Sequence, residues 1–306
     1  MKKPKALKKG GTIGVIAPAG IVNPQELTLG MKRLEELGFR VIPGRHVLSA
    51  HRYLAGLDRE RAEDIHEMFS NPEISAVLCA RGGYGTMRLL PLLDEGLIAR
   101  HPKILVGSSD ATALLLYLVQ QVGMVAFHGP MVAPDFGRTP SSLTTEGFLK
   151  ATGSAEPIGP VRFEEAVRLR KGVVQGRLTG GCLSILCALL GTPYEIKTRD
   201  AVLLLEDVNE APYRIDRMLT QLKMAGKLKD IRGVIFGRMI NCKPEADEDY
   251  SLEEMIREVL EDVDGPILYG LPAGHGGEQV ALPLGVQVEV DGNRGIMTVL
   301  ESGVEA

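Results

Sequence analysis

Residues 103–122 read KILVGSSDATALLLYLVQQV, and this stretch decides the fold class. Its first five residues form a short apolar run of the kind that makes a buried β-strand, whereas residues 111–122 place apolar side chains at helical spacing. Ser108, Ser109 and Asp110 fill the turn between them. The stretch therefore predicts a strand that passes through a polar turn directly into a helix.

The same strand-to-helix unit recurs through the first half of the chain. Apolar runs alternate with longer segments of helical periodicity. Because strands that are apolar throughout must be covered on both faces, this alternation is typical of a parallel sheet with helices on either side. We predict strands at 12–17, 40–43, 75–80, 103–107 and 124–128, and helices at 24–37, 58–70, 84–99 and 111–122.

The second half predicts a different arrangement. Between about residues 135 and 172 the periodicity fades and Gly, Pro, Ser and Thr become frequent, which favours a domain boundary. We predict an N-terminal α/β domain over 1–150, a linker over 151–172 and an α+β domain with more antiparallel pairing over 173–306. Its last two strands are joined by DGNR, a hairpin signal. We expect strands at 173–178, 201–206, 232–236, 266–269, 286–290 and 296–300, and helices at 182–190, 212–225 and 250–262.

The composition excludes several classes of partner. The 35 Lys and Arg residues are balanced by 39 Asp and Glu residues, for a formal net charge of −4, so we expect no nucleic-acid partner. The basic residues within 2–9 are not followed by the apolar segment of a secretory signal, and no apolar run reaches the roughly 18 residues that cross a bilayer. The sequence predicts a cytoplasmic protein that does not bind a membrane.

No sequence pattern indicates a metal or a cofactor. The four cysteines form no CxxC pair, so we expect buried, reduced thiols, and the six histidines include no HxH or HExxH pair. Glycines at 10, 11 and 14 precede and enter their strand, whereas a dinucleotide loop must follow one, and no Walker-type phosphate loop is present. Glycine is nevertheless abundant, at 36 of 306 residues, and the question is which loops these glycines serve.

Ser109 and Asp110 lie just beyond the carboxyl end of a predicted strand, where parallel sheets bind their ligands. A serine at such a turn lies beside the free N–H groups and the positive dipole end of the next helix, which suits a nucleophile with an oxyanion site. Ser and Asp are also favoured helix N-caps, so these residues have a purely structural interpretation as well. Residues 81–85, RGGYG, form a second turn of this kind, which suits either an oxyanion site or an ordinary tight turn.

A serine nucleophile needs a base, and the base needs an orienting acid. His275 is the strongest candidate base because it lies among glycines in PAGHGG at 272–277, where packing does not explain a histidine. Glu206 ends the most apolar strand of the second half, and a carboxylate there is either paired or functional. Asp207 and Glu210 are competing carboxylates.

Taken in order, these motifs resemble those of the LD-carboxypeptidases, a family of serine peptidases that includes the microcin C immunity peptidases. The resemblance covers nearly the whole chain. The motifs are APAG at 17–20, RGGYG at 81–85, GSSDAT at 107–112, GGCLS at 180–184, LEDVNEAPYRIDR at 205–217 and PAGHGG at 272–277.

The resemblance implies a Ser-Glu-His triad of Ser109, Glu206 and His275. It further implies backbone oxyanion donors at Gly83 and Asp110, a flavodoxin-like first domain, a β-rich second domain, a site between them and a homodimer. One position departs from the family pattern, because the residue before the nucleophile is often aromatic there and is Ser108 here. Ser108 therefore remains an alternative nucleophile.

The activity that the resemblance implies is release of the terminal D-alanine from murein tetrapeptides during cell-wall recycling. We expect Arg81 and Tyr84 to help bind the peptide, although Arg81 has an equally good structural interpretation. One alternative substrate is a microcin-like peptidyl-nucleotide, whose peptidases stack the base on an aromatic residue, often Trp; this chain has no Trp. A muropeptide-binding protein without activity is a second alternative.

Overall fold

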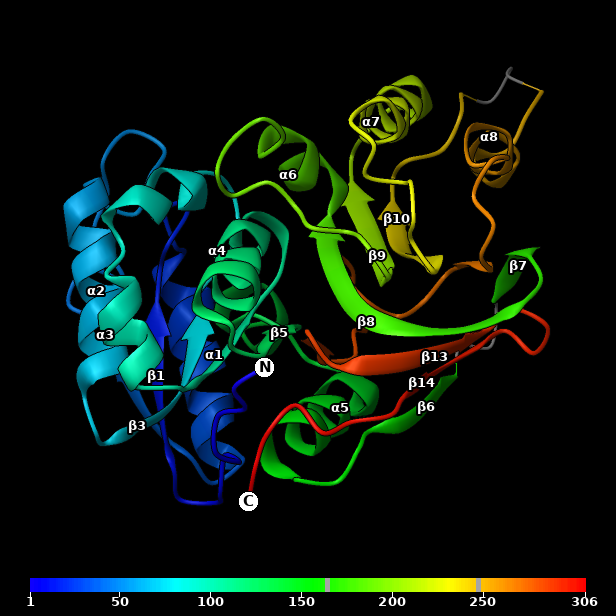
Figure 1. Ribbon diagram of the computed structural model, residues 1–306. Coiled ribbons are helices and arrows are strands. Elements are labelled where there is room, and N and C mark those ends of the chain that lie inside the picture. The colour runs from blue at the N-terminus through cyan, green and yellow to red at the C-terminus, as the bar shows by residue number, and fades with distance from the viewer. Residues whose placement is uncertain (163–165, 246–248) are drawn as a thin grey trace.

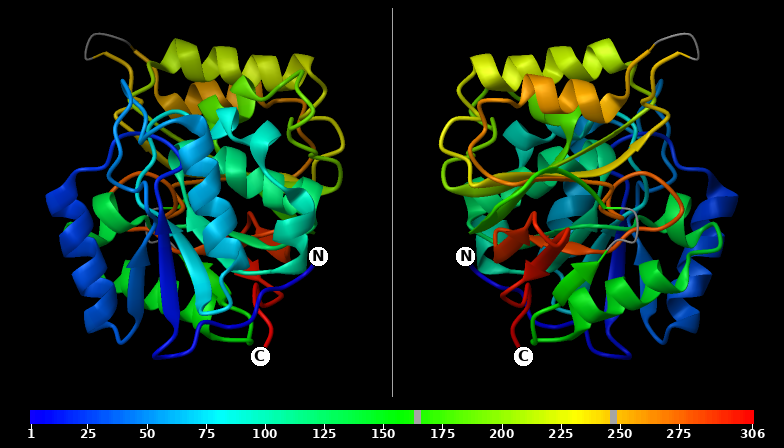
Figure 2. Two further views of the ribbon diagram at one scale, coloured as in Figure 1. Left: turned by 90° about the vertical axis from the view of Figure 1, so that its left-hand side faces the viewer. Right: turned by 90° about the vertical axis from the view of Figure 1, so that its right-hand side faces the viewer.

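The computed structural model describes residues 1–162, 166–245 and 249–306, and its strands form two β-sheets that lie side by side (Figure 1). Helices cover both faces of the first sheet, and the two ends of the chain lie close together (Figure 2). The proximity of the ends is fixed by backbone bonds, because Ala6 N–H donates to the Glu305 carbonyl and Glu305 N–H donates to the Pro4 carbonyl.

The first sheet confirms the predicted parallel arrangement. Its strand order is β2-β1-β3-β4-β5-β12, which is the flavodoxin-like order with one strand added at the edge. All pairs are parallel except β5 with β12. The strands are β1 (Thr12–Ile16), β2 (Arg40–Pro43), β3 (Ile74–Cys79), β4 (Ile104–Gly107), β5 (Ala126–His128) and β12 (Leu282–Leu284).

The helices of the first domain follow the predicted periods in most places. α1 begins at Pro24 because the Asn23 side chain accepts bonds from the N–H groups of Gln25 and Glu26. The helices are α1 (Pro24–Glu36), α2 (Asp58–Ser70), α3 (Glu95–Arg100), α4 (Thr112–Tyr117), which continues as a π-helix to Val122, and α5 (Ser142–Gly153).

The single helix predicted over 84–99 is wrong. That segment forms two short 3₁₀ turns, Thr86–Arg88 and Leu90–Leu92, before α3 begins. Pro91 has no N–H to donate and restricts Leu90 before it, so a continuous α-helix cannot pass through this point. Asp94 then caps α3 by accepting a bond from the Leu97 N–H.

The second sheet has the order β6-β14-β13-β8-β9-β10-β11-β7. β8 to β11 are parallel, and the strands on either side pair antiparallel, as does the predicted β13–β14 hairpin. Its strands are β6 (Gly159–Arg162), β7 (Val167–Arg170), β8 (Val173–Cys182), β9 (Ala201–Val208), β10 (Gly233–Ile240), β11 (Ile267–Tyr269), β13 (Gln287–Asp291) and β14 (Ile296–Val299). Its helices are α6 (Leu183–Ala188), α7 (Pro212–Met224) and α8 (Leu252–Val259).

The segment predicted as a linker, 151–172, contains the two edge strands of the second sheet, β6 and β7. Near its C-terminal end the chain also returns to the first sheet, where β12 pairs with β5. The domain limits stay a prediction. β12 links the two halves of the chain, because it lies in the second half of the sequence and in the first sheet.

The four cysteines are buried, which confirms the prediction of buried thiols. In the part of the chain that the structure describes, no helix is long and apolar enough to cross a membrane.

Candidate active site

Ser109 occupies a strained turn at the carboxyl end of β4. Its φ is +57°, a left-handed conformation that costs a residue with a Cβ roughly 1–2 kcal/mol. Such strain at a strand-to-helix turn is typical of an exposed nucleophile. Ser108, the alternative, has an extended backbone and is only 3% exposed. The backbone therefore sets Ser109 apart from its neighbour.

Asp110 fastens this turn to the glycine-rich loop after β3. Its carboxylate accepts a bond of 2.8 Å from the Thr86 N–H and is buried. Burial raises the pKa of Asp110, and the hydrogen bonds of Thr86 oppose that rise. The side chain of Asp110 thus holds two loops in register, while its backbone N–H is the group predicted to face an oxyanion.

The loop 81–85 packs directly against Ser109. A Cβ added to Gly82 would lie 2.7 Å from Ser109 Cβ and 2.8 Å from its Oγ, so no larger residue fits there without displacing the serine. Gly83 has a φ of +115° and Gly85 a φ of +130°, which also favour glycine. The glycines of this loop therefore allow the backbone to approach the predicted nucleophile.

Glu206 and His275 form the second half of the site. Glu206 Oε2 lies 2.7 Å from His275 Nδ1 and also accepts a bond of 3.2 Å from the His275 N–H. Gly274 makes this approach possible, because a Cβ there would lie 2.3 Å from Glu206 Oε2. The carboxylate is fully buried, whereas the imidazole is 23% exposed. The histidine thus faces the cavity with the carboxylate behind it.

The charges of this pair stabilise one another. Burial alone would raise the pKa of Glu206, but hydrogen bonds from His128 and His275 lower it to about 2. Burial alone would lower the pKa of His275, but the hydrogen bond and charge of Glu206 raise it above its usual 6.5. Glu206 is therefore ionised at neutral pH and favours the protonated form of His275.

The two competing carboxylates have other partners. Asp207 accepts bonds of 2.8 Å from the N–H groups of Ser184 and Val208. Glu210 pairs with Arg214 at 3.5 Å. Of these three neighbouring acids, all in the described part of the chain, Glu206 is the one hydrogen-bonded to His275.

His128 is a member of the site that sequence reasoning did not assign. It ends β5 in the first domain, and its Nε2 lies 3.4 Å from Glu206 Oε1, with both side chains fully buried. Its Nδ1 has no hydrogen-bond partner among the described residues. Its position at the end of an apolar strand was the available signal, but nothing in the sequence pairs it with Glu206.

One cavity brings the predicted residues of both domains together. Ser109 and His275 both line it, and its volume is about 240 Å³. An adjoining cavity of about 360 Å³ shares His275 and contains Asp135, whose pKa burial raises to about 6. The first cavity is lined by Glu26, Arg81, Gly82, Gly83, Ser109, Met131, Ala133, Pro134, Arg138 and His275.

The two residues expected to bind the peptide differ in their placement. Arg81 lines the cavity, but its guanidinium donates to the carbonyls of Ile21 at 2.8 Å and Gly82 at 3.1 Å. Tyr84 is not among the residues that line the cavity, and its exposed ring packs against Tyr53 with 5.8 Å between ring centres. The contacts of Arg81 support its structural interpretation.

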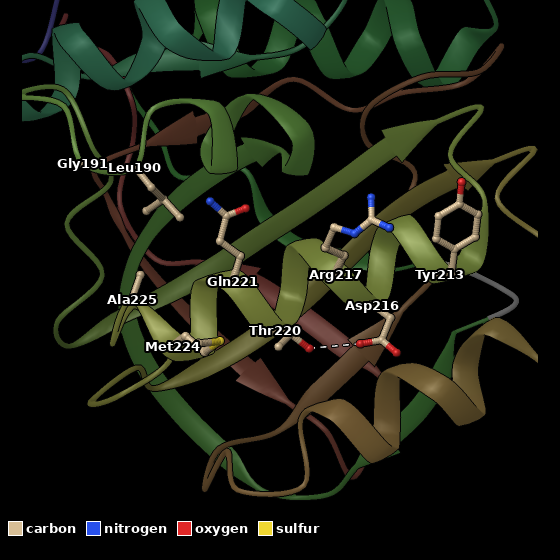
Figure 3. Close-up of a pocket in the computed structure, with 9 residues that line it drawn as sticks. All are labelled: Leu190, Gly191, Tyr213, Asp216, Arg217, Thr220, Gln221, Met224 and Ala225. Atoms are coloured by element: carbon tan, nitrogen blue, oxygen red, sulfur yellow. Dashed lines mark hydrogen bonds between the residues drawn. The ribbon is translucent and has the colours of Figure 1, made fainter.

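A wider hollow of about 790 Å³ lies along α7, away from these residues (Figure 3). Tyr213, Arg217 and Met224 line it, and it contains none of the predicted catalytic side chains. Within the described ranges, no three His, Cys, Asp or Glu side chains are grouped so that they could hold a metal ion. The small cavity at Ser109 is therefore the candidate active site.

Comparison with known proteins identifies the family. Models of the LD-carboxypeptidase N-terminal and C-terminal domains match residues 13–129 and 175–290. A probable murein peptide carboxypeptidase of Bacillus subtilis (strain 168) is 42% identical over 304 residues, covering 99% of this chain and 95% of that protein. The crystal structure of muramoyltetrapeptide carboxypeptidase from Oxalobacter formigenes matches with a TM-score of 0.84 at 32% identity, covering 94% of this chain and 97% of that one. The microcin C7 self-immunity protein MccF of Escherichia coli is 29% identical over 319 residues, covering 93% of this chain and 92% of that protein. The chain therefore belongs to the LD-carboxypeptidase family.

Proposed function

We propose that this protein is a serine carboxypeptidase that releases the terminal D-alanine from murein tetrapeptides. The observation that carries the proposal is the cavity into which a strained serine, Ser109, and a carboxylate-bound histidine, His275, both project from different domains. The probable murein peptide carboxypeptidase of Bacillus subtilis, to which this chain is similar along nearly its whole length, supports the choice of substrate.

The proposed reaction proceeds through an acyl-enzyme. Ser109 Oγ attacks the carbonyl carbon of the last peptide bond while His275 Nε2 takes the hydroxyl proton. Glu206, at 2.7 Å from Nδ1, fixes the tautomer that leaves Nε2 free to accept and stabilises the imidazolium that forms. The N–H groups of Gly83 and Asp110 would stabilise the oxyanion.

The tetrahedral intermediate that this attack forms then collapses. The C–N bond breaks, His275 returns its proton to the leaving amine of D-alanine, and the peptide stays attached to Ser109 as an ester. A water molecule, deprotonated by His275, hydrolyses that ester and restores the serine. No step needs a cofactor.

The first alternative is a peptidase for microcin-like peptidyl-nucleotides. The similarity to the microcin C7 self-immunity protein favours it, and the absence of Trp from the chain weakens it. The second alternative, a binding protein without activity, leaves the strain at Ser109 and the buried Glu206–His275 pair without a purpose. Incubation with a peptidyl-nucleotide conjugate and with a tetrapeptide distinguishes these two alternatives from the proposed activity.

We propose further that the protein works as a cytoplasmic homodimer. The resemblance of its motifs to the family is the support for both points. Light scattering after gel filtration tests the dimer, and fractionation of the native cells tests the location.

The decisive experiment follows free D-alanine released from L-Ala-D-Glu-meso-diaminopimelate-D-Ala. We expect release by the wild-type protein, no release by Ser109→Ala and retained release by Ser108→Ala. No release by wild type would overturn the carboxypeptidase activity. Loss of activity in Ser108→Ala with retention in Ser109→Ala would reassign the nucleophile.

A further inference from the structure

Two opposite charges, Glu26 and Arg138, line the same cavity as Ser109 and His275. Arg138 Nη2 lies 3.3 Å from Glu26 Oε1, and Nε lies 3.4 Å from the same oxygen. The Glu26 side chain is 34% exposed and the Arg138 side chain 71% exposed. Because exposed ion pairs of this length are weak, a ligand can separate these two groups at little cost.

The backbones that carry the two charges are held firmly. The guanidinium of Arg33, on α1, donates a bond of 2.6 Å to the Phe136 carbonyl and a second bond to the Arg138 carbonyl. A Cβ on Gly137 would lie 2.3 Å from the Glu26 carbonyl oxygen, so α1 and the segment at 137 are in direct contact. The two charged side chains therefore project from fixed positions.

Arg138 is also the freer of the two arginines that line this cavity. The guanidinium of Arg81 donates to the Ile21 and Gly82 carbonyls. The side-chain hydrogen bonds of Arg138 within the described residues go to Glu26 alone. A carboxylate that enters the cavity therefore finds an available guanidinium in Arg138.

We infer that Glu26 and Arg138 form a subsite for a side chain that ends in both an ammonium and a carboxylate group. Glu26 would take the ammonium and Arg138 the carboxylate, which suits the fork of a guanidinium. Both new pairs replace the weak contact that the two residues make with each other.

This inference rests on the proposed function and names its preferred substrate. The third residue of the tetrapeptide supplies the carbonyl that Ser109 attacks, so its side chain lies in the cavity beside the nucleophile. meso-Diaminopimelate ends in an ammonium and a carboxylate on one carbon, whereas lysine ends in an ammonium alone. A lysine peptide would satisfy Glu26 and leave Arg138 without its new partner. The subsite therefore selects diaminopimelate.

The experiment compares three tetrapeptides that differ only in the third residue: meso-diaminopimelate, its side-chain amide, and lysine. For the wild-type enzyme we expect kcat/KM to be about tenfold or more higher for the first peptide than for the other two, since hydrogen bonds to charged groups are worth that factor. Arg138→Gln should remove this preference by lowering the first value at least tenfold and changing the other two less than about twofold.

Two further variants sharpen the test. Glu26→Gln should lower kcat/KM for all three peptides, because each carries the ammonium. Arg45→Gln is the matched control: Arg45 forms a similar exposed pair with Glu67 at 3.1 Å, outside the cavity, and its loss should change none of the values. Binding of the three peptides to Ser109→Ala protein, measured by calorimetry, should show the same order without turnover.

The outcomes separate the subsite from the activity. Equal wild-type rates on the three peptides would overturn the subsite and leave the carboxypeptidase intact. An equal loss on all three peptides in Arg138→Gln would also overturn it, since Arg138 would then hold the terminal D-alanine carboxylate common to them. No D-alanine from any peptide, with no preferential binding by Ser109→Ala, would overturn both proposals.

Discussion

Glu206 carries a full negative charge in a place with no access to water, and two histidines from different domains make this possible. Because its folded-state pKa of about 2 lies below the usual 4.5, Glu206 contributes stability above pH 4.5 that is lost as the pH falls toward 2. The sequence indicated this residue from its place at the end of an apolar strand. Its second partner, His128, depends on a contact between β5 and β9 that no local pattern predicts.

The raised pKa of His275 sets the pH dependence of the proposed reaction. His275 must be neutral to take the serine proton, so kcat/KM should fall on the acid side through an inflection above 6.5. Glu206→Gln removes the charge that raises this pKa and should move the inflection to lower pH, with kcat reduced by about a hundredfold or more. Initial rates of D-alanine release between pH 5 and 9 check this. An inflection that does not move would show that the charge of Glu206 does not raise the pKa of His275.

His128 is predicted to position Glu206. His128→Ala removes the donor 3.4 Å from Oε1 and leaves a buried carboxylate oxygen unpaired, which should cost about 1–3 kcal/mol of unfolding free energy and about tenfold in kcat. His128→Gln keeps an amide N–H near the same place and should recover part of both. Urea unfolding and the pH profile measure the two effects. If kcat and the pH inflection are both unchanged in His128→Ala, His128 contributes only to packing.

The strands in the middle of both sheets could be predicted from the sequence, and so could one edge strand, β2, but the edge strands β6, β7 and β12 could not. β1, β3 and β4 are buried along nearly their whole length and read as uninterrupted apolar runs. β6 and β7 are the two edges of the second sheet; β6 contains Pro160, and β7, VRLR, alternates apolar and basic residues. Short, charged or proline-containing strands are typical of edges, and by composition they resemble loops.

A buried hydrogen bond joins α4 of the first domain to the end of β8 in the second sheet. Thr112, the first residue of α4, accepts a bond of 3.1 Å from the Cys182 N–H, and both residues are buried. Thr112→Val keeps the shape and leaves that N–H without an acceptor, so we expect a loss of about 1–3 kcal/mol in unfolding free energy. Thr112→Ser keeps the hydroxyl and should lose less of the unfolding free energy. Urea unfolding of both variants measures these losses. No loss in Thr112→Val would show that this hydrogen bond does not contribute to stability, and a larger loss in Thr112→Ser than in Thr112→Val would show that the methyl group contributes more than the hydrogen bond.

The meeting of Ser109 with His275 is a property of the whole molecule. The sequence placed each residue at the end of a strand or in a glycine-rich loop, but their proximity followed only from resemblance to a family. β12 is the physical reason, because it carries the chain back from the His275 loop to pair with β5, where Leu282 lies opposite His128. The backbone hydrogen bond from Ala6 to Glu305 also joins the two ends of the chain.

Because so many of these links cross between the two sheets, we expect the protein to unfold as one cooperative unit. Cys79 lies in β3 of the first sheet, and Cys242 follows β10 of the second; both are buried, and burial raises the pKa of Cys79 to about 12, so neither thiol should react in the folded protein. Pulsed thiol labelling across a urea series, read by peptide mass spectrometry, should give the same midpoint for both cysteines. Earlier labelling of either cysteine would mean that its sheet unfolds independently. In that case the geometry between Ser109 and His275 would depend on docking of two separate domains rather than on one folded core.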